Sequence, residues 1–362
     1  MVIIYTRAYN AENTIRATIE SILNQTYTDF KYILFNNGSL DNTLSIMREY
    51  ARKDKRIVIL SSDVNRIGFL SNMPALKYIV NNFAEEDFFC NVDADDVYEL
   101  DFFEKMVDFC VKNRLDSAFC GYKILERNTG KILDVKTLSS DLVVTNRELP
   151  EHFMTYRRYT TDMWAKFFKV SLLEYFFEEE RFEQFKVRNN QQTFIFDALS
   201  NSARFGFLAQ PLLVYTQSDT AQKNIRLQGN INYTHIMNLF HTMKGFVDSF
   251  VNVSGETRRR NDEYLYAIYY GYIKDIFEVI FFSNAISLSQ KMLHLQNIFS
   301  NYVTQEMLQV KASDEFYSLH QESKRELCQK VVDFIKEHEE NDIAVTYGKN
   351  IINIMHDCGI DV

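Results

Sequence analysis

The sequence is poor in the residues that most often interrupt regular structure, with 3 prolines and 11 glycines among 362 residues. This scarcity argues against long flexible linkers and predicts long helices and strands. The 5 cysteines form no Cys-x-x-Cys pair and no pattern with histidine, so we expect reduced, mostly buried thiols. No apolar run reaches the roughly 18 residues that span a bilayer, and residues 1–5 lack the features of a signal peptide.

Positive charge is also scarce, because 40 Lys and Arg residues stand against 49 Asp and Glu residues, a formal net charge of −9. This balance argues against nucleic acid as the main partner. It suits a cytoplasmic protein that binds an anionic ligand through a local site and a metal. Hydrophobic residues make up 46% of the chain, which is typical of a globular protein, and the length favours two domains.

Predicted strands and amphipathic helices alternate over the first 122 residues. In the first helix Ile15, Ile19 and Ile22 recur at helical spacing, and Asn10 is a candidate N-cap. This order predicts an α/β fold with a mixed, mostly parallel sheet, in which ligands bind beyond the carboxyl ends of the strands. Strands are predicted at 2–5, 31–35, 57–60, 87–92 and 117–122.

Residues 123–222 are less regular. We expect a hairpin around Asn128-Thr129-Gly130, a strand at 163–170 and a helix at 191–199. Residues 205–215 read as a strand pair broken at Pro211.

Helical periodicity dominates from about residue 225, which predicts an all-α carboxyl-terminal domain. We therefore expect two domains, at 1–222 and 223–362. The predicted helices of the second domain cover 230–252, 260–284, 286–300, 303–320, 322–338 and 345–357.

The most informative motif is Asp93-Ala94-Asp95-Asp96, which directly follows the predicted strand at 87–92. Side chains alternate along a strand, so Asp93 and Asp95 leave the strand end on the same side. Two neighbouring carboxylates repel each other unless a positive charge lies between them. A hard divalent cation is the natural neutraliser, and it commonly shares its remaining positions with phosphates. The motif indicates a nucleotide–metal site, whereas an isolated Asp-x-Asp is more often a charged loop.

Five short segments in order carry a resemblance to a known family: residues 6–12, 21–27, 37–43, 65–68 and 93–96. Weaker matches at 163–166 and 211–215 extend it to about residue 220. Through these segments the chain resembles family 2 glycosyltransferases, which have the GT-A fold. The resemblance implies a Rossmann-like domain that binds a nucleotide-diphosphate sugar, and the helical tail lies outside it.

The resemblance also implies roles for single residues. Asp93 would contact ribose and metal, and Asp95 would be the main ligand of Mg²⁺ or Mn²⁺. A bound cation lowers the cost of charge on a departing UDP. Arg7 and Tyr9 would lie beside the nucleotide base, and Arg66 would help to hold the nucleotide or diphosphate. Plainer alternatives are that Tyr9 packs at a strand end and that Arg66 is a solvated loop charge.

The chain departs from the family pattern on the base side and on the acceptor side. Asn36 stands where the family usually has an Asp that contacts uracil, so uracil could bind more weakly or another base could be preferred. Gln191 stands where an acid usually acts as general base, and it cannot take a proton near neutral pH. A histidine that often follows the last strand is missing. Loss of a general base typically costs about 10²–10⁴-fold in rate.

Several explanations of the missing base stay open. Asp162, Glu180, Glu183 or Asp197 could supply it, or the reaction could need no base at that position. Alternatively, the chain could bind a nucleotide sugar without turning it over. Trp164 could stack on an acceptor sugar, although a core position is at least as common for a lone Trp.

Three functions therefore compete. The leading hypothesis is a metal-dependent, inverting glycosyltransferase that moves a sugar from a nucleotide-diphosphate donor, UDP first, to a hydroxyl of a glycan, lipid or protein. The second is a degenerate nucleotide-sugar-binding or regulatory module that acts through its helical tail. The third, a nucleotidyltransferase, lacks support because no glycine-rich phosphate loop follows the first strand.

The helical tail carries two further features. Residues 263–282 are crowded with aromatic side chains, which predicts a helix buried between others. Arg258-Arg259-Arg260 could touch a membrane surface or an anionic acceptor, or could be a solvated helix start. Such a tail could build an acceptor site or a homo-oligomer interface.

Overall fold

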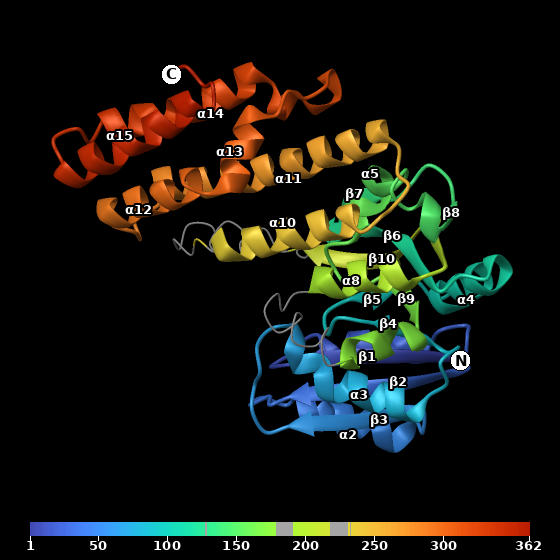
Figure 1. Cartoon of the computed structure of the whole chain (residues 1–362). Helices are drawn as coiled ribbons and strands as arrows, with labels where there is room; N and C mark the ends of the chain where they lie inside the picture. The colour runs from blue at the N-terminus through green and yellow to red at the C-terminus, as the bar shows by residue number, and fades with distance from the viewer. Residues whose placement is uncertain (127–128, 179–190, 218–230, 232) are drawn as a thin grey trace. The chain divides into compact units, whose positions relative to one another are not determined.

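In the computed structural model the chain divides into two compact units, Met1–Ser218 and Asp219–Val362. The structure describes residues 1–126, 129–178, 191–217, 231 and 233–362. The domain boundary that the sequence predicts near residue 222 falls outside these residues. The first unit contains strands and helices, and the described part of the second is helical (Figure 1).

The first unit is built on a ten-stranded sheet. Its strands are β1 (Val2–Ala8), β2 (Phe30–Asn37), β3 (Ile57–Ser62), β4 (Phe88–Asn91), β5 (Val97–Tyr98), β6 (Ser117–Glu126), β7 (Ile132–Lys136), β8 (Leu142–Thr145), β9 (Lys166–Lys169) and β10 (Arg204–Gln217). They follow the order β3-β2-β1-β4-β9-β6-β10-β5, with β7 beside β6 and β8 beside β10. Pairing is parallel from β3 through β4 and between β6 and β10, and β9 runs antiparallel to both β4 and β6. The mixed sheet is therefore confirmed.

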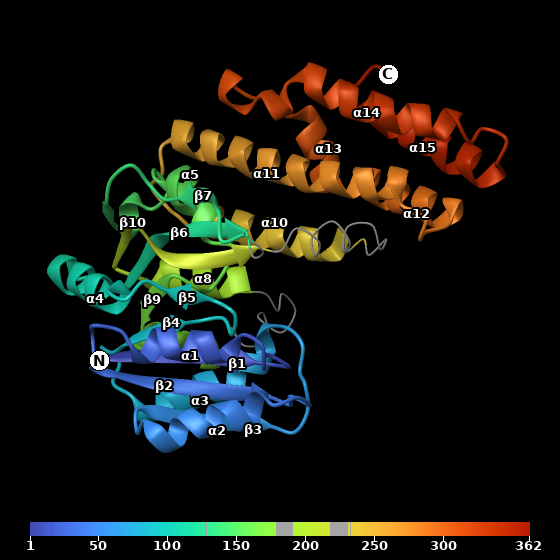
Figure 2. The same cartoon turned by 180° about the vertical axis from the view of Figure 1, so that it is seen from behind.

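Helices cover both faces of this sheet (Figures 1 and 2). Val2 and Ile4 of β1 belong to the core under α1, α2 and α4. Tyr5 points to the opposite face, where its ring lies 6.3 Å from that of Phe89, which in turn lies 6.4 Å from Phe194 of α8. This is the two-residue alternation of a strand buried on both faces. The helices are α1 (Ile15–Leu23), α2 (Thr43–Lys53), η1 (Phe69–Asn72), α3 (Met73–Asn82), α4 (Phe102–Asn113), η2 (Asn146–Glu148), α5 (Phe153–Tyr156), η3 (Arg157–Tyr159), α6 (Ser171–Glu174), η4 (Tyr175–Phe177) and α8 (Gln191–Asn201).

Two local predictions in this unit are wrong. Asn10 does not cap α1, which begins at Ile15; it has a φ of 49°, and its Oδ1 accepts a hydrogen bond from the Leu40 N–H at 2.9 Å. The predicted strand at 163–170 begins only at Lys166, since Ala165 has a φ of 56° and leaves the extended region.

The predicted break at Pro211 is also corrected. Residues 204–217 form one strand, and the register between β10 and β6 shifts on either side of Pro211. Proline has no N–H to donate to a ladder, so an irregularity lets the strand continue past it. The short strands β5 and β8 were not predicted.

The described part of the second unit consists of helices packed on one another. They are α10 (Tyr233–Asp248), α11 (Gly255–Phe282), α12 (Leu288–Phe299), α13 (Tyr302–Gln309), η5 (Asp314–Leu319), α14 (Gln321–Lys336) and α15 (Asp342–Asp357). The aromatic helix α11 buries Tyr266, Tyr269, Tyr270 and Phe277, which confirms that it is a core helix. No helix in the described ranges is long and apolar enough to cross a membrane. The five cysteines are free and buried, as predicted.

The single helix predicted at 303–320 is two helices. At the end of α13, the buried ammonium of Lys324 on α14 donates hydrogen bonds to the carbonyl oxygens of Leu308 at 2.7 Å and Val310 at 2.6 Å. These bonds satisfy carbonyls that the end of α13 leaves without intrahelical partners.

Candidate functional site

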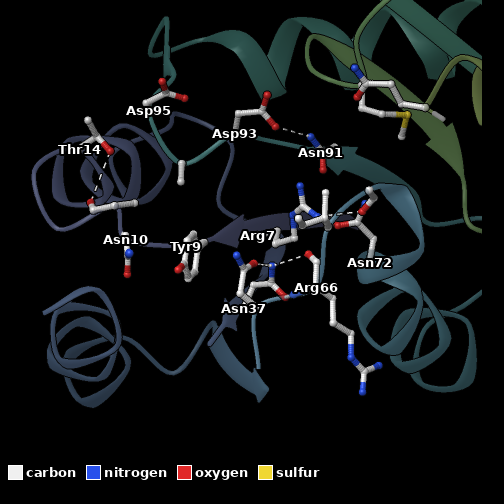
Figure 3. Close-up of a pocket in the computed structure, with 17 residues that line it drawn as sticks. Arg7, Tyr9, Asn10, Thr14, Asn37, Arg66, Asn72, Asn91, Asp93 and Asp95 are labelled. Atoms are coloured by element: carbon white, nitrogen blue, oxygen red, sulfur yellow. Dashed lines mark hydrogen bonds between the residues drawn. The ribbon is translucent and has the colours of Figure 1, made fainter. Parts of the chain in front are cut away.

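A polar cavity of about 530 Å³ opens in the first unit at the carboxyl ends of β1, β2 and β4 (Figure 3). This is the edge of the sheet at which the sequence predicts ligand binding. The described residues that line it are Arg7, Tyr9, Asn10, Ala11, Thr14, Asn37, Asn65, Arg66, Ile67, Gly68, Asn72, Asn91, Asp93, Ala94, Asp95, Met163 and Gln191. Polar side chains thus dominate its wall.

One wall is the segment after β3, which is held against the ends of the neighbouring strands. Arg7 donates from Nη1 to the Gly68 carbonyl at 3.1 Å and to the Ser71 hydroxyl. Asn37 donates from Nδ2 to Asn65 Oδ1 at 2.8 Å and to the Arg66 carbonyl at 2.9 Å. The cavity is therefore preformed on this side.

Gly38 is required for the same contact. Its φ is 76°, and a Cβ atom built there would lie 2.6 Å from the backbone nitrogen of Asn65. A side chain at this position would both strain the backbone and push the wall away.

Asp93 and Asp95 both line the cavity, as their spacing after β4 predicts. The Asp93 side chain reaches solvent through the cavity, yet surrounding protein displaces enough water to raise the pKa of its carboxyl. The charges of Asp95 and Asp162 raise this pKa further, and a hydrogen bond of 3.0 Å from Asn91 Nδ2 to Asp93 Oδ1 opposes them. Figure 3 shows Asn91 beside Asp93.

Asp96 follows this pair in the sequence and is 2% exposed. Its Oδ2 has no hydrogen-bond partner among the described residues. Burial raises the pKa of the Asp96 carboxyl, and the negative charges of Asp93, Asp95 and Asp162 raise it further. The buried Lys166 also belongs to this charge cluster: burial lowers the pKa of its ammonium to about 8, although Asp162 and Asp93 favour the charged form.

The residues fit a divalent metal ion. The donors are carboxylate oxygens, which Mg²⁺ and Mn²⁺ prefer. The acids repel each other, and a cation between them would relieve that repulsion. Within the described parts of the chain, no three His, Cys, Asp or Glu residues form a metal-binding group. A cation held by Asp93 and Asp95 would therefore need further ligands from water or from the phosphates of a bound nucleotide.

The predicted nucleotide-binding residues divide into two groups. Arg7, Tyr9 and Arg66 line the cavity, and Figure 3 shows the Arg66 guanidinium directed away from Asp93. Asn36 does not line it. Asn36 is 3% exposed and donates from Nδ2 to Ser61 Oγ at 3.0 Å, whereas its neighbour Asn37 faces the cavity.

The predicted acceptor-side residues also divide. Gln191 lines the cavity at the start of α8 and donates from Nε2 to Asp162 Oδ1 over 3.4 Å, so the structure brings these two together. Asp197 is not a lining residue, because it lies six residues further along α8, a rise of about 9 Å. Glu180 and Glu183 lie outside the described residues.

Trp164 occupies a core position. It is 7% exposed, with its ring 4.6 Å from that of Tyr122 and 5.8 Å from that of Tyr215, and it does not line the cavity. Lys166 donates from Nζ to the Trp164 carbonyl at 3.1 Å, which fixes the turn that carries Met163 into the cavity.

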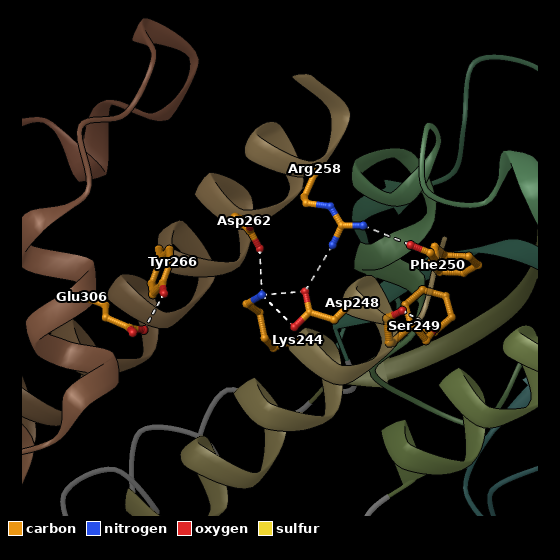
Figure 4. A network of polar contacts seen from close by, with 9 residues as sticks. Lys244, Asp248, Ser249, Phe250, Arg258, Asp262, Tyr266 and Glu306 are labelled. Atoms are coloured by element: carbon orange, nitrogen blue, oxygen red, sulfur yellow. Dashed lines mark hydrogen bonds and ion pairs between the residues drawn. The ribbon is translucent and has the colours of Figure 1, made fainter. Parts of the chain in front are cut away.

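The three arginines of α11 have partners within the second unit. Arg258 pairs with Asp248 at 3.9 Å and donates to the Phe250 carbonyl (Figure 4). Arg259 pairs with Glu263, and Arg260 pairs with Glu315 at 2.9 Å. Lys244 bridges Asp248 and Asp262 at 2.6 and 3.3 Å in the same network. These contacts account for the arginine run as ion pairs within α11 and between α11 and its neighbours α10 and η5.

The sequence reasoning missed most of the amides on the cavity wall, namely Asn37, Asn65, Asn72 and Asn91. Asn37 and Asn91 end β2 and β4, so their positions at strand ends were a usable signal. Asn72 gave no such signal, because it precedes a helix and resembles an ordinary N-cap residue.

Comparison with known proteins agrees with this fold. Residues 3–182 match glycosyl transferase family 2. An uncharacterized glycosyltransferase of Haemophilus influenzae is 39% identical over 127 residues, which are 34% of this chain and 38% of that protein. The UDP-Glc:alpha-D-GlcNAc-diphosphoundecaprenol beta-1,3-glucosyltransferase WfgD of Escherichia coli is 28% identical over 141 residues, 38% of this chain and 53% of that protein. The chain thus spans about half or less of the length of these relatives.

Among solved structures, S. aureus TarS 1-349 in complex with UDP-GlcNAc superposes with a TM-score of 0.53. The sequence identity is 16%, and the superposition covers 82% of this chain and 80% of that one. This likeness shows the GT-A fold. By the match over residues 3–182, the chain belongs to glycosyl transferase family 2.

Proposed function

We propose that this protein transfers a sugar from a nucleotide-diphosphate donor, with UDP as the first candidate nucleotide, to a hydroxyl group of a glycan, lipid or protein. The observation that carries the proposal is the pair Asp93 and Asp95 on the wall of a polar cavity at the carboxyl ends of parallel strands. The name of the relative WfgD, a glucosyltransferase with a UDP-Glc donor, supports this donor class. We place the activity in residues 1–222 and leave residues 223–362 as a helical domain with a partner or acceptor role.

The cavity residues divide the work of donor binding. Asp93 and Asp95 would hold Mn²⁺ or Mg²⁺, which would offset the charge of the diphosphate. Arg7 is the cation anchored in the wall, and its remaining N–H groups are suited to a phosphate oxygen. Tyr9 offers an aromatic face, 41% exposed, on which a base could stack.

In an inverting transfer, the acceptor hydroxyl attacks the anomeric carbon from the side opposite the diphosphate. The new glycosidic bond forms as the bond to the diphosphate oxygen breaks, and a base removes the hydroxyl proton. We propose Asp162 as that base. It contacts Gln191 on the cavity wall, and its negative charge raises the pKa of Asp93 and of Asp96.

One observation favours the second candidate, a nucleotide-sugar-binding module. Gln191, at the position where the family usually has an acid, lines the cavity, whereas its hydrogen-bond partner Asp162 is not among the described lining residues. A site that only binds a nucleotide sugar needs no base there.

A panel of nucleotide sugars with Mn²⁺ or Mg²⁺, scored both for binding and for release of the nucleotide, tests the proposal. We expect at least one donor to bind and to be cleaved, slowly with water and faster with a suitable acceptor. Binding without cleavage by any acceptor offered would favour the binding module. No metal-dependent binding of any donor would contradict both functions.

A further inference from the structure

Three carboxamide side chains of the cavity, Asn72, Asn91 and Gln191, share an arrangement. Each one uses one end of its amide group for a bond to a protein side chain and is a lining residue of the cavity. An amide fixed at one end has a defined group, donor or acceptor, at its other end. Such fixed groups are suited to hydroxyls, which both donate and accept.

Asn72 gives the strongest case. It occupies the N-cap position of α3, yet its side chain makes no capping hydrogen bond. Its Oδ1 instead accepts a bond of 2.8 Å from the hydroxyl of Tyr5, which is 1% exposed and which burial keeps protonated by raising its pKa. This buried bond fixes the orientation of the Asn72 amide on the cavity wall.

The free ends of the three amides follow from these bonds. The Nδ2 group of Asn72 has no hydrogen-bond partner among the described residues and can donate into the cavity. Asn91 and Gln191 donate from their nitrogens to Asp93 and Asp162, which leaves their oxygens as acceptors. The set offers one free amide nitrogen, which donates, and two free amide oxygens, which accept, all uncharged.

Charges of both signs flank these amides. The cationic side chains among the described lining residues are Arg7 and Arg66. Arg7 is held by Gly68 and Ser71, and Figure 3 shows Arg66 directed away from Asp93. Figure 3 also shows Asn72 and Asn91 on the side of Arg7 opposite to Tyr9. The carboxylates of Asp93 and Asp162 adjoin Asn91 and Gln191.

We infer that Asn72, Asn91 and Gln191 form the subsite for the donor sugar, and that they select a neutral hexose or N-acetylhexosamine over a uronic acid. The inference rests on the proposed function and names its sugar class. With the metal and Arg7 engaged by the diphosphate, the charge that a sugar carboxylate would meet is that of Asp162 beside Gln191, and like charges placed together in a binding site cost several kcal/mol. We therefore expect a uronic acid donor to bind at least about tenfold more weakly than its neutral counterpart.

Calorimetry with Mn²⁺ tests the subsite, using UDP, UDP-glucose and UDP-glucuronate, and GDP, GDP-mannose and GDP-mannuronate in case the base is guanine. Asn72→Ala should weaken the neutral nucleotide sugar about 3- to 10-fold, the value of one hydrogen bond, and leave the bare nucleotide unchanged. Asn82→Ala, an exposed Asn on the same helix, is the matched control and should change neither. Gln191→Ala, at the half-buried start of α8, should repeat the effect even if Asn72→Ala does not fold.

Each result decides the matter. Equal weakening of UDP and UDP-glucose would place Asn72 on the nucleotide or diphosphate and overturn the subsite. Tight binding of UDP-glucuronate by the unchanged protein would overturn the selectivity for neutral sugars. If bare nucleotides bind with metal but neither variant affects the sugar, the inference fails alone. If no nucleotide binds, the proposed function fails first.

Discussion

Replacing Asp162 with asparagine removes one negative charge beside the cavity and little else. The carboxylate accepts hydrogen bonds from the Thr161 hydroxyl at 2.8 Å and from Gln191 Nε2 at 3.4 Å, and an asparagine oxygen can still accept one of them. Because the charge of Asp162 raises the pKa of Asp93, its removal makes Asp93 easier to ionise. Metal and donor binding should therefore survive the change.

Turnover should not survive it. If Asp162 takes the proton of the acceptor hydroxyl, Asp162→Asn should lower kcat at least about 100-fold, which is about 2.7 kcal/mol of activation free energy. The assay is release of the nucleotide from the donor identified by the panel, with binding of the bare nucleotide measured in parallel. Asp197→Asn is the matched control, since Asp197 lies about 9 Å further along α8, and it should keep the rate within about twofold.

The reasoning would be refuted by either of two results. A rate unchanged by Asp162→Asn would show that another group, or none, accepts the proton. A large loss of nucleotide affinity in the same variant would show that Asp162 supports the donor site rather than the proton transfer.

Two further predictions concern stability. Gly38→Ala should destabilise the first unit by more than about 2 kcal/mol, because it adds a clash with the backbone of Asn65 to the strain of a left-handed backbone. The control Gly130→Ala, with no atom within 4 Å of the new Cβ, should cost only the backbone strain of about 1 kcal/mol. Equal losses of stability in chemical denaturation would contradict this. Burial lowers the pKa of Lys324 from 10.5 to about 8. Between these pH values the Lys324 amine is protonated in the unfolded chain and largely neutral in the folded one, so the stability of the protein should rise with pH relative to that of Lys324→Met. The difference should reach at most about 3 kcal/mol, from a pKa difference of about 2.5, and a constant difference across pH 7–11 would contradict it.

Local patterns in the sequence predicted the acidic centre of the site. A run of apolar residues followed by Asp93 and Asp95 is enough to place two carboxylates at a strand end, because strand alternation depends only on neighbours. The same locality explains why the central strands were predicted and why β5, which has two residues, was not.

The predictions that failed concern features that depend on contacts between residues far apart in the sequence. Asn10 has the composition of an N-cap, but its side chain bonds to Leu40, 30 residues away. Asn72 likewise bonds to Tyr5, 67 residues away, and its role as a lining residue cannot be read from its neighbours. The carbonyls at the end of α13 accept hydrogen bonds from Lys324, which belongs to a later helix.

The central claim is that Asp93 and Asp95 bind a nucleotide diphosphate through a divalent ion. Titration of UDP by calorimetry, with Mn²⁺ and again with EDTA, tests it directly in the unchanged protein, in Asp95→Asn and in Asp108→Asn, an exposed control on α4. We predict affinity that is largely lost with EDTA and in Asp95→Asn and is retained in Asp108→Asn. Equal affinity with and without metal, or full affinity in Asp95→Asn, would contradict the account.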